Sequence, residues 1–312
     1  MTNACWRCCN HACGRDVLWR RRANGADYVA EFLANGFRDL GVRVSMVGSH
    51  GQCDPMTAKL PDGADLIVHN SGFALTPEAV ARLRAVAPVF LWTFTDEIGW
   101  WRRRIAPVSV LVDLHYSYSQ QHGFGGHVRY LPLAADPTQY RPERCAYDDG
   151  NRDVDVCMIG AKRAYRAALC EGLAKRFPRS LFSWAMATPV TAIRQLYART
   201  KVVVAPVQDC DEDVPGRAWG CPCRTFDVRA CRAFELEVAR PGLADAYPHA
   251  CIMPAIPDVA AAVEAWSDRI AALLADPDAR AAQAEADYRR TMEQHLYRHR
   301  AQRMLDDLKA RS

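Results

Sequence analysis

Short apolar runs alternate with amphipathic segments along almost the whole chain, and this alternation restricts the possible folds more than any other feature. Segment 26–40 carries apolar residues at helical spacing and is followed by Gly41, a typical helix end. Apolar runs in the same half of the chain predict strands at 17–19, 42–47, 66–68, 89–94 and 108–112. Because strands that alternate with helices form a mostly parallel sheet covered on both faces, we expect an α/β fold.

The same pattern starts again in the second half of the chain. An apolar run at 154–159 ends in Gly160 and precedes a predicted helix at about 163–177. Further strands are predicted at 181–184, 201–207 and 251–253, and a long basic helix at 279–309. Since 312 residues correspond to about two domains of ~150 residues, we expect two doubly wound, Rossmann-like domains.

A boundary between the two halves is visible in the sequence. Prolines interrupt segment 131–142, and a polar, charged stretch follows at 148–153. Such composition is typical of a hinge between domains. We therefore predict four parts, in which the last helix packs back on the first domain: a Cys-rich leader at 1–14, an N-terminal domain at 15–140, a C-terminal domain at 141–290 and a closing helix at 291–312.

Composition indicates an ordinary globular protein of the cytoplasm. The formal net charge is +4, and 35 of the 40 basic residues are arginines, a bias that is not by itself a nucleic-acid signal. No apolar stretch approaches the ~20 residues that span a bilayer, and the N-terminus lacks the pattern of a secretion signal. The odd number of cysteines, 13, is scattered over a long chain and favours reduced thiols over a disulfide framework.

The end of the strand at 154–159 is the first candidate binding site. Gly160 allows backbone N–H groups to approach a phosphate, and Lys162, Arg163 and Arg166 add cations for a diphosphate. A strand end with surface arginines is the alternative interpretation. The full glycine fingerprint of dinucleotide-binding enzymes and the Walker motif are both missing, which disfavours a dehydrogenase or a P-loop enzyme.

A second candidate lies at 224–234, where Arg224 and Asp227 stand three residues apart at the start of a predicted short helix. An arginine and an acid at this spacing suit a site that binds a phosphate and ribose hydroxyls. A capped helix with an exposed ion pair would look the same in sequence.

Four segments together resemble the CgeB-like (spore-maturation-protein) group of GT-B glycosyltransferases. The linker at 131–142 is similar to Leu-Pro-x-Ala-x-Asp-Pro-x-x-Phe/Tyr-x-Pro, and 155–160 is similar to Asp-Val-x-Phe-Ile-Gly. Segment 224–234 resembles Arg-Thr-Phe-Glu-Ile-Pro-Ala-Cys-Gly-Ala-Phe, and 295–300 resembles a His-Thr-Tyr-x-x-Arg element. The resemblance covers roughly the last 180 residues.

The resemblance implies a GT-B fold, with two Rossmann-like domains that face each other across a cleft. It implies a glycosyltransferase that moves a hexosyl or pentosyl group from a nucleotide-diphosphate sugar to an acceptor hydroxyl, without a metal ion or a cofactor. Gly160, Lys162, Arg163, Arg166 and Arg224 would hold the diphosphate.

Two positions depart from the family pattern. Asp227 replaces the family's Glu and would hold ribose or sugar hydroxyls as part of the catalytic site. Arg232 replaces a Gly, so we expect a bulky side chain near the donor that narrows donor choice or inactivates the site. Asp227 and Glu235 have the spacing of the two acids of retaining enzymes, but the flanking residues place the first acid on Trp219. Retention or inversion therefore stays open.

The acceptor is expected on the N-terminal domain. Asn24 and Gly25 follow the first predicted strand, and Asp96 and Glu97 follow a hydrophobic strand. A carboxylate at a strand end is well placed as a general base for an acceptor hydroxyl, so Asp96 is the predicted base. His69, at the end of another predicted strand, is the alternative candidate for the base.

An aromatic and basic run at 100–104 completes the predicted acceptor site. Trp100 and Trp101 could stack on sugars or bases, and Arg102 and the two arginines after it could bind phosphates. An apolar–basic surface patch without a function is the alternative.

The N-terminal residues Cys5, Cys8, Cys9, His11 and Cys13 have the chemistry of zinc ligands but lack a second ligand pair at finger spacing. Cys221 and Cys223 could supply such a pair, so zinc binding stays open; we interpret the N-terminal residues as a leader and predict no metal site.

Two other functions remain open. The acceptor could be DNA with a hydroxymethylated base, as in phage DNA glycosylation, or a phosphorylated glycan or lipid. Alternatively, the chain could be an inactive nucleotide-sugar-binding module. The sugar, the nucleotide, the acceptor and the oligomeric state are not encoded in any motif that we can identify.

Overall fold

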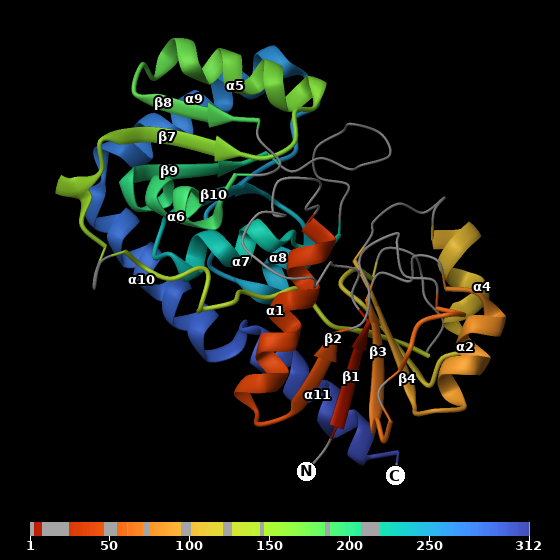
Figure 1. Ribbon diagram of the computed structural model, residues 1–312. Coiled ribbons are helices and arrows are strands. Elements are labelled where there is room, and N and C mark those ends of the chain that lie inside the picture. Colours follow the sequence, from red (N-terminus) through yellow and green to blue (C-terminus); the bar gives the residue numbers. More distant parts are fainter. Residues whose placement is uncertain are drawn as a thin grey trace. The chain divides into compact units, whose positions relative to one another are not determined.

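The computed structural model describes residues 3–7, 25–46, 55–60, 62–70, 75–94, 101–120, 127–143, 147–184, 188–206 and 219–311. The chain forms two compact units, which we describe separately. Unit 1 comprises Met1–Leu133 and Leu296–Ser312, and unit 2 comprises Ala134–His295. Figure 1 shows a parallel sheet with helices on both faces in each unit.

The described part of unit 1 is built on a six-stranded sheet in the order β2-β1-β3-β4-β5-β6, with every neighbouring pair parallel. Its strands are β1 (Asn3–Arg7), β2 (Arg43–Met46), β3 (Leu66–Asn70), β4 (Val89–Thr93), β5 (Leu114–Ser117) and β6 (Val128–Tyr130). The α/β prediction for this half is thus confirmed.

The N-terminal segment corrects the sequence interpretation. Residues 3–7, interpreted as part of a leader, form β1 between β2 and β3. Because both edges of this strand pair with a neighbour, backbone hydrogen bonding supports it without the apolar run that sequence patterns require. The strand predicted at 17–19 lies outside the described residues.

The strand predicted at 108–112 is also wrong. Residues Ala106–Ser109 form a short helix, α4, with Pro107 in its first turn, and the strand β5 begins later, at Leu114. Proline is favoured in a first helical turn, where its missing N–H would have no partner. Val108 is apolar because it packs in the core and not because it lies in a strand.

Helices cover both faces of the unit 1 sheet (Figure 1). The helix α2 (Pro77–Arg84), the π-helix η1 (Trp101–Ile105) and α4 pack over one face. The helices α1 (Gly25–Asp39) and α11 (Tyr297–Lys309) pack against each other on the other face. A Cβ at Gly36 of α1 would lie 2.5 Å from the Tyr297 carbonyl carbon, so this close contact requires glycine.

Charged side chains of α11 fasten the helix to unit 1. The Tyr116 hydroxyl donates to Asp307 at 2.7 Å, and Arg129 forms an ion pair with the same carboxylate. Although partial burial raises the pKa of Asp307, these hydrogen bonds outweigh it and lower the pKa below its usual value. Arg300 donates to the carbonyls of Pro132 and Leu133 at 2.8 and 2.9 Å, which holds the end of unit 1's first segment.

The described part of unit 2 contains a five-stranded parallel sheet in the order β11-β10-β9-β7-β8. Its strands are β7 (Val154–Ile159), β8 (Ser180–Ser183), β9 (Thr200–Ala205), β10 (Glu235–Val238) and β11 (Ile252–Met253). Its helices are α5 (Ala164–Arg176), α6 (Val190–Arg199), α7 (Cys223–Ala230), α8 (Pro241–Ala246), α9 (Val259–Ala275) and α10 (Pro277–Gln294). The helix predicted at 279–309 is divided into α10 and α11 around His295.

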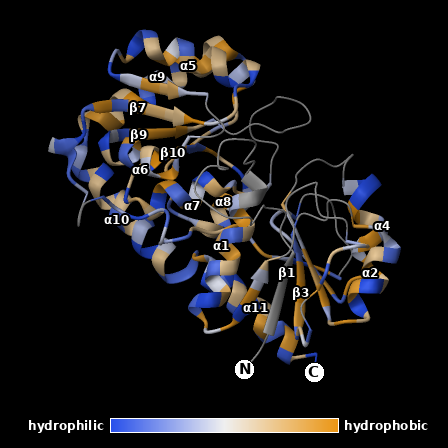
Figure 2. Ribbon diagram, in the orientation of Figure 1, coloured by the Kyte–Doolittle hydropathy of each residue, from blue (hydrophilic) through white to orange (hydrophobic). Residues whose placement is uncertain are grey.

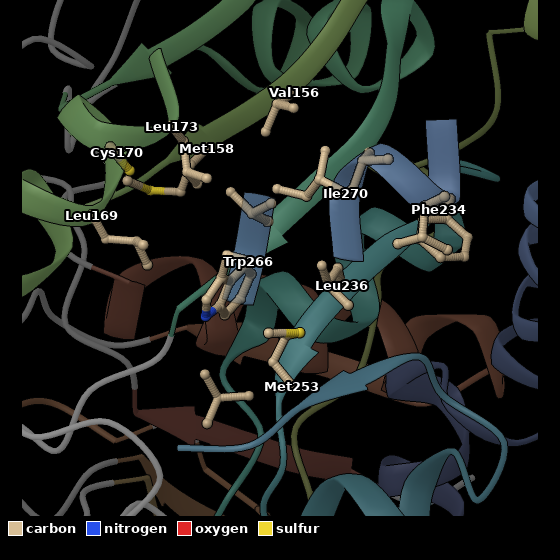
Figure 3. Close-up of a cluster of buried hydrophobic side chains, with 14 of the residues drawn as sticks. Val156, Met158, Leu169, Cys170, Leu173, Phe234, Leu236, Met253, Trp266 and Ile270 are labelled. Atoms are coloured by element: carbon tan, nitrogen blue, oxygen red, sulfur yellow. The ribbon is translucent and has the colours of Figure 1, made fainter. Parts of the chain in front are cut away.

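A hydrophobic core lies on one face of the unit 2 sheet. Alternate residues of the strands, such as Val156, Met158 and Leu236, meet Trp266 and Ile270 of α9 (Figure 3). The helices α5 and α9 lie together over this face (Figure 1). Hydrophobic colouring prevails in most strands, whereas the helices mix hydrophobic and hydrophilic residues (Figure 2).

The opposite face of the same sheet buries a charged cluster. Arg229 of α7 is fully buried and donates to Glu237 at 2.6 Å and to Asp287 at 3.2 Å, and it also pairs with Glu235. Although burial opposes ionisation, the guanidiniums of Arg229 and Arg240 lower the pKa of Glu237. Burial and the neighbouring Glu237 instead raise the pKa of Glu235 well above its usual value. Glu235 is therefore a buried structural group at the start of β10.

Candidate functional site

The sheet of unit 2 changes winding direction between β7 and β9. The chain passes from β7 through α5 to β8 on one side, and from β9 through α7 to β10 on the other. Open parallel sheets bind ligands at such a point, beside the carboxyl ends of the strands. This rule selects the residues that follow Ile159 and Ala205.

Two guanidinium groups meet at the carboxyl end of β7. Arg224 donates to the Ile159 carbonyl at 2.6 Å, and Arg166 donates to the Ala161 carbonyl at 2.8 Å. A Cβ at Gly160 would lie 3.0 Å from Nη1 of Arg224 and 3.3 Å from Nη1 of Arg166. Glycine therefore allows both cations to approach the strand end. Among the described residues, the buried Nε of Arg224 has no hydrogen-bond partner.

Lys162 and Arg163 lie beside this pair but differ from it in exposure. Both are exposed in the loop that leads into α5, whereas Arg166 is 8% exposed. Arg163 is the residue at the helix N-cap, and its side chain makes no capping hydrogen bond. The structure thus brings together Gly160, Arg166 and Arg224 and leaves the other two cations in solvent.

Asp227 lies one helical turn after Arg224 and is 6% exposed. Burial raises the pKa of its carboxyl well above the usual value, repulsion from Asp136 adds to the rise, and Arg224 opposes it. In the described part of the chain, Oδ1 of Asp227 has no hydrogen-bond partner. Asp227 is therefore a buried carboxyl group near Arg224, with one oxygen that no described group pairs.

A cavity of about 480 Å³ opens beside the same strand end. Ile159 and Ser183, the last residues of β7 and β8, form part of its wall, and the Gly160 N–H donates to the Ser183 carbonyl at 3.1 Å. The remaining described lining residues come from β8, from α6 and the residue Thr188 before it, and from Glu143 before β7: Glu143, Leu181, Thr188, Ala192, Gln195, Leu196, Ala198 and Arg199. The volume lies within the range of small-molecule sites. No sequence motif indicated this cavity, because its polar residues come from separate segments.

Arg232 lies at the other end of α7, and this corrects the expectation that it crowds the donor. The residue has a left-handed backbone, with φ of 51°, directly after the helix end, where glycine is usually preferred. Its side chain lies 3.1 Å from Glu285 and stacks over Tyr288 at 4.1 Å. Arg232 therefore adopts a left-handed turn, and its side chain packs on Glu285 and Tyr288 of α10.

Substitution of Arg232 tests this assignment. Arg232→Gly relieves an unfavourable backbone conformation but loses the contacts with Glu285 and Tyr288, so we expect a change in stability close to zero. Arg232→Ala loses the contacts and keeps the backbone cost, so it should be less stable than the Gly variant by about 1 kcal/mol. Chemical denaturation measures both. A Gly variant no more stable than the Ala variant would contradict the backbone argument.

The predicted acceptor residues of unit 1 are only partly described. Asn24, Asp96, Glu97 and Trp100 lie outside the described residues, and Gly25 is the first residue of α1. His69 is buried in β3, next to its last residue. Trp101 is half-buried and Arg102 is exposed, both in η1.

Sequence reasoning missed a hydrogen-bonded network in unit 1. His115 of β5 lies 2.6 Å from Ser109 Oγ through Nδ1 and 2.9 Å from Thr93 Oγ1 through Nε2. Ser109 Oγ also lies 3.0 Å from Nε2 of the exposed His127. Burial, together with the nearby His127, lowers the pKa of His115 to about 3. Such a low pKa makes the imidazole a weak base, and both of its ring nitrogens already bond to Ser109 and Thr93, so His115 is poorly suited to be the acceptor base.

This buried histidine should make stability depend on pH. Protonation is harder in the folded state than in the unfolded state, whose histidine titrates near 6.5, so protons favour unfolding as the pH falls below that value. Between pH 7 and pH 5 we expect His115 to account for a loss of about 2 kcal/mol. Urea denaturation at both pH values measures the loss. His115→Asn should reduce it, and an equal loss in both proteins would contradict the assignment.

No group of three or more His, Cys, Asp or Glu residues in the described ranges could hold a metal ion. Of the N-terminal candidates, Cys5 lies in β1, and Cys8, Cys9, His11 and Cys13 lie outside the described residues. Among the described helices, none has the length and apolar character needed to cross a membrane.

Comparison with known proteins supports the glycosyltransferase resemblance. Residues 164–306, a little under half of the chain, match a family model described as "Glycosyl transferase-like". No curated protein gives a significant sequence match.

Several solved structures share the whole fold at low sequence identity. Sucrose-phosphate synthase from Thermosynechococcus elongatus has a TM-score of 0.63 at 14% identity, with 100% of both chains covered. An alpha-glucosyltransferase in complex with UDP-glucose and DNA containing an abasic site has a TM-score of 0.69 at 8% identity, covering 98% of this chain and 99% of that chain. The Anabaena protein HepE in complex with UDP-glucose has a TM-score of 0.61 at 11% identity, with 98% and 99% covered.

The chain therefore has the GT-B fold of glycosyltransferases, as its sequence indicated. Its C-terminal half also carries a glycosyltransferase-like sequence pattern.

Proposed function

We propose that this protein is a glycosyltransferase that moves a sugar from a nucleotide-diphosphate sugar to an acceptor hydroxyl. The observation that carries the proposal is the approach of Arg166 and Arg224 to Gly160 at the carboxyl end of β7. Two guanidinium groups beside a glycine at a strand end are suited to bind a diphosphate, because no side chain occupies the space between them. The solved structures of HepE and of the alpha-glucosyltransferase with UDP-glucose support a uridine diphosphate donor.

The two arginines would supply the main electrostatic contribution to the reaction. When the bond between the sugar and the diphosphate breaks, negative charge grows on the leaving oxygen. Guanidinium groups that are already in place stabilise this charge without a reorganisation cost. Charge-assisted hydrogen bonds from arginine are strong, so this chemistry does not require a metal ion.

The cavity beside β8 would hold the nucleoside. Its apolar wall of Ile159, Leu181 and Leu196 suits the face of a base, and Ser183 and Gln195 offer hydrogen-bonding groups. Because Ile159 contacts both the cavity and the Arg224 guanidinium, a nucleoside there would direct its phosphates toward the arginines.

Two carboxyl groups retain the roles expected from the sequence. Asp227 would bind a donor hydroxyl, for which its unpartnered Oδ1 is available. Asp96 would act as the base that accepts the proton of the acceptor hydroxyl.

A thermal-unfolding panel with UDP, GDP, ADP, dTDP and NAD tests the donor site. A ligand at about 100 times its dissociation constant adds about 2.7 kcal/mol to stability, so we expect UDP to raise the unfolding temperature by several degrees. Arg224→Gln should remove most of this shift, because it deletes one of the two cations that hold the diphosphate.

Arg289→Gln is the matched control, since Arg289 is an exposed arginine of α10 and its replacement makes the same change in charge. Its shift with UDP should equal that of the wild type. The proposal fails if no nucleoside diphosphate stabilises the wild type, or if Arg224→Gln and Arg289→Gln respond alike.

A further inference from the structure

The π-helix η1 gives unit 1 an exposed basic surface. Trp101 and Ile105 pack against the hydrophobic core of unit 1, and Ile105 is fully buried. The three residues between them, Arg102, Arg103 and Arg104, are all exposed. A π-helix turns less per residue than an α-helix, so three successive side chains can share the solvent-facing side. Single π-helical turns are rare and occur frequently at functional sites.

The three arginines have no partner within the described part of the protein, in hydrogen bonds or in ion pairs. Some other arginines of the same unit are paired: Arg84 with Asp113, and Arg129 and Arg303 with Asp307. The basic surface, defined as residues 102–104, therefore carries three unused guanidiniums.

Residues 102–104 lie in η1, the first described helix between β4 and β5. In a parallel sheet, the first turn of a crossover lies toward the carboxyl ends of the strands, where ligands bind. The arginines thus stand toward the binding edge of unit 1.

We infer that the basic surface binds the phosphate backbone of a nucleic acid that carries the acceptor hydroxyl. This inference rests on the proposed function, because it names the substrate class of that transferase. Arginine matches phosphate oxygens with paired hydrogen bonds, and three arginines in a row suit regularly spaced phosphates.

The surroundings favour a nucleic acid over a membrane. Among the described residues, the first exposed large hydrophobic residue after η1 is Val110, which is 66% exposed. One valine does not provide an apolar face for insertion into lipid. A small phosphorylated sugar is also a poor match, because three side chains projecting into solvent suit an extended polyanion better than a single phosphate.

Fluorescence anisotropy with a short labelled DNA duplex, measured over a series of salt concentrations, tests the inference. The affinity of the wild type should fall steeply as salt rises. The triple variant Arg102→Gln, Arg103→Gln, Arg104→Gln should reduce the slope of log K against log salt by about 2.7, since each phosphate contact contributes about 0.9. Each single variant should reduce the slope by about 0.9.

A matched triple variant controls for net charge. Arg43→Gln, Arg289→Gln and Arg311→Gln remove three exposed arginines elsewhere and should leave the slope close to that of the wild type. Equal effects of the two triple variants would overturn the inference, as would binding to vesicles of anionic phosphatidylglycerol without binding to DNA.

UDP stabilisation of the same preparations separates the two proposals. Absent DNA binding with intact UDP stabilisation overturns the basic-surface inference alone. Absent UDP stabilisation of the wild type overturns the proposed function, and with it the assignment of the nucleic acid as acceptor.

Discussion

The buried Arg229 is the interaction on which the geometry of unit 2 depends. Its guanidinium joins α7 to Glu237 of β10 and to Asp287 of α10, and Thr225 of the same helix donates to Glu237 at 2.9 Å. Breaking a buried ion pair by removing one partner typically costs about 3–5 kcal/mol, so this cluster fixes the helix firmly. Because α7 is held through Thr225 near its start and Arg229 near its end, its first turn presents Arg224 to the end of β7.

Both units use the same topology for different tasks. In each, the first strand lies between the second and the third, and the later strands extend the sheet to one side. The carboxyl ends therefore meet at a winding change in each unit. In unit 2 that point carries two guanidiniums and a cavity, whereas unit 1 combines a buried neutral histidine network with an exposed basic turn.

Strands were predicted correctly where a continuous apolar run marks them in the sequence. The strand predicted at 154–159 matches β7 because its apolar run is continuous and its ending glycine is needed at the site. The strand β10 was not predicted, because Glu235 and Glu237 interrupt the continuous apolar run on which the strand predictions relied. Only the fold shows that Arg229 balances them.

Arg232 and β1 are two further features that a local sequence pattern does not predict. We interpreted Arg232, which replaces the family's glycine, as a change at the donor site. In the structure, Arg232 follows the C-terminal end of α7, whereas Arg224 lies in the first turn of that helix. The strand β1 depends on two neighbouring strands, which no local window of sequence contains. Of the candidate site, the charged residues near Gly160 could be predicted from the sequence, whereas the cavity and the pKa shifts depend on burial.

Gly160 offers the most direct test of the central claim that unit 2 holds a nucleoside diphosphate between Arg166 and Arg224. A Cβ there would stand 3.0 Å from one guanidinium and 3.3 Å from the other, in the space that phosphate oxygens would share. Isothermal titration of Gly160→Ala with UDP should show affinity at least about tenfold weaker than the wild type, a loss of about 1.4 kcal/mol, in a protein that still folds. Unchanged affinity would contradict the account.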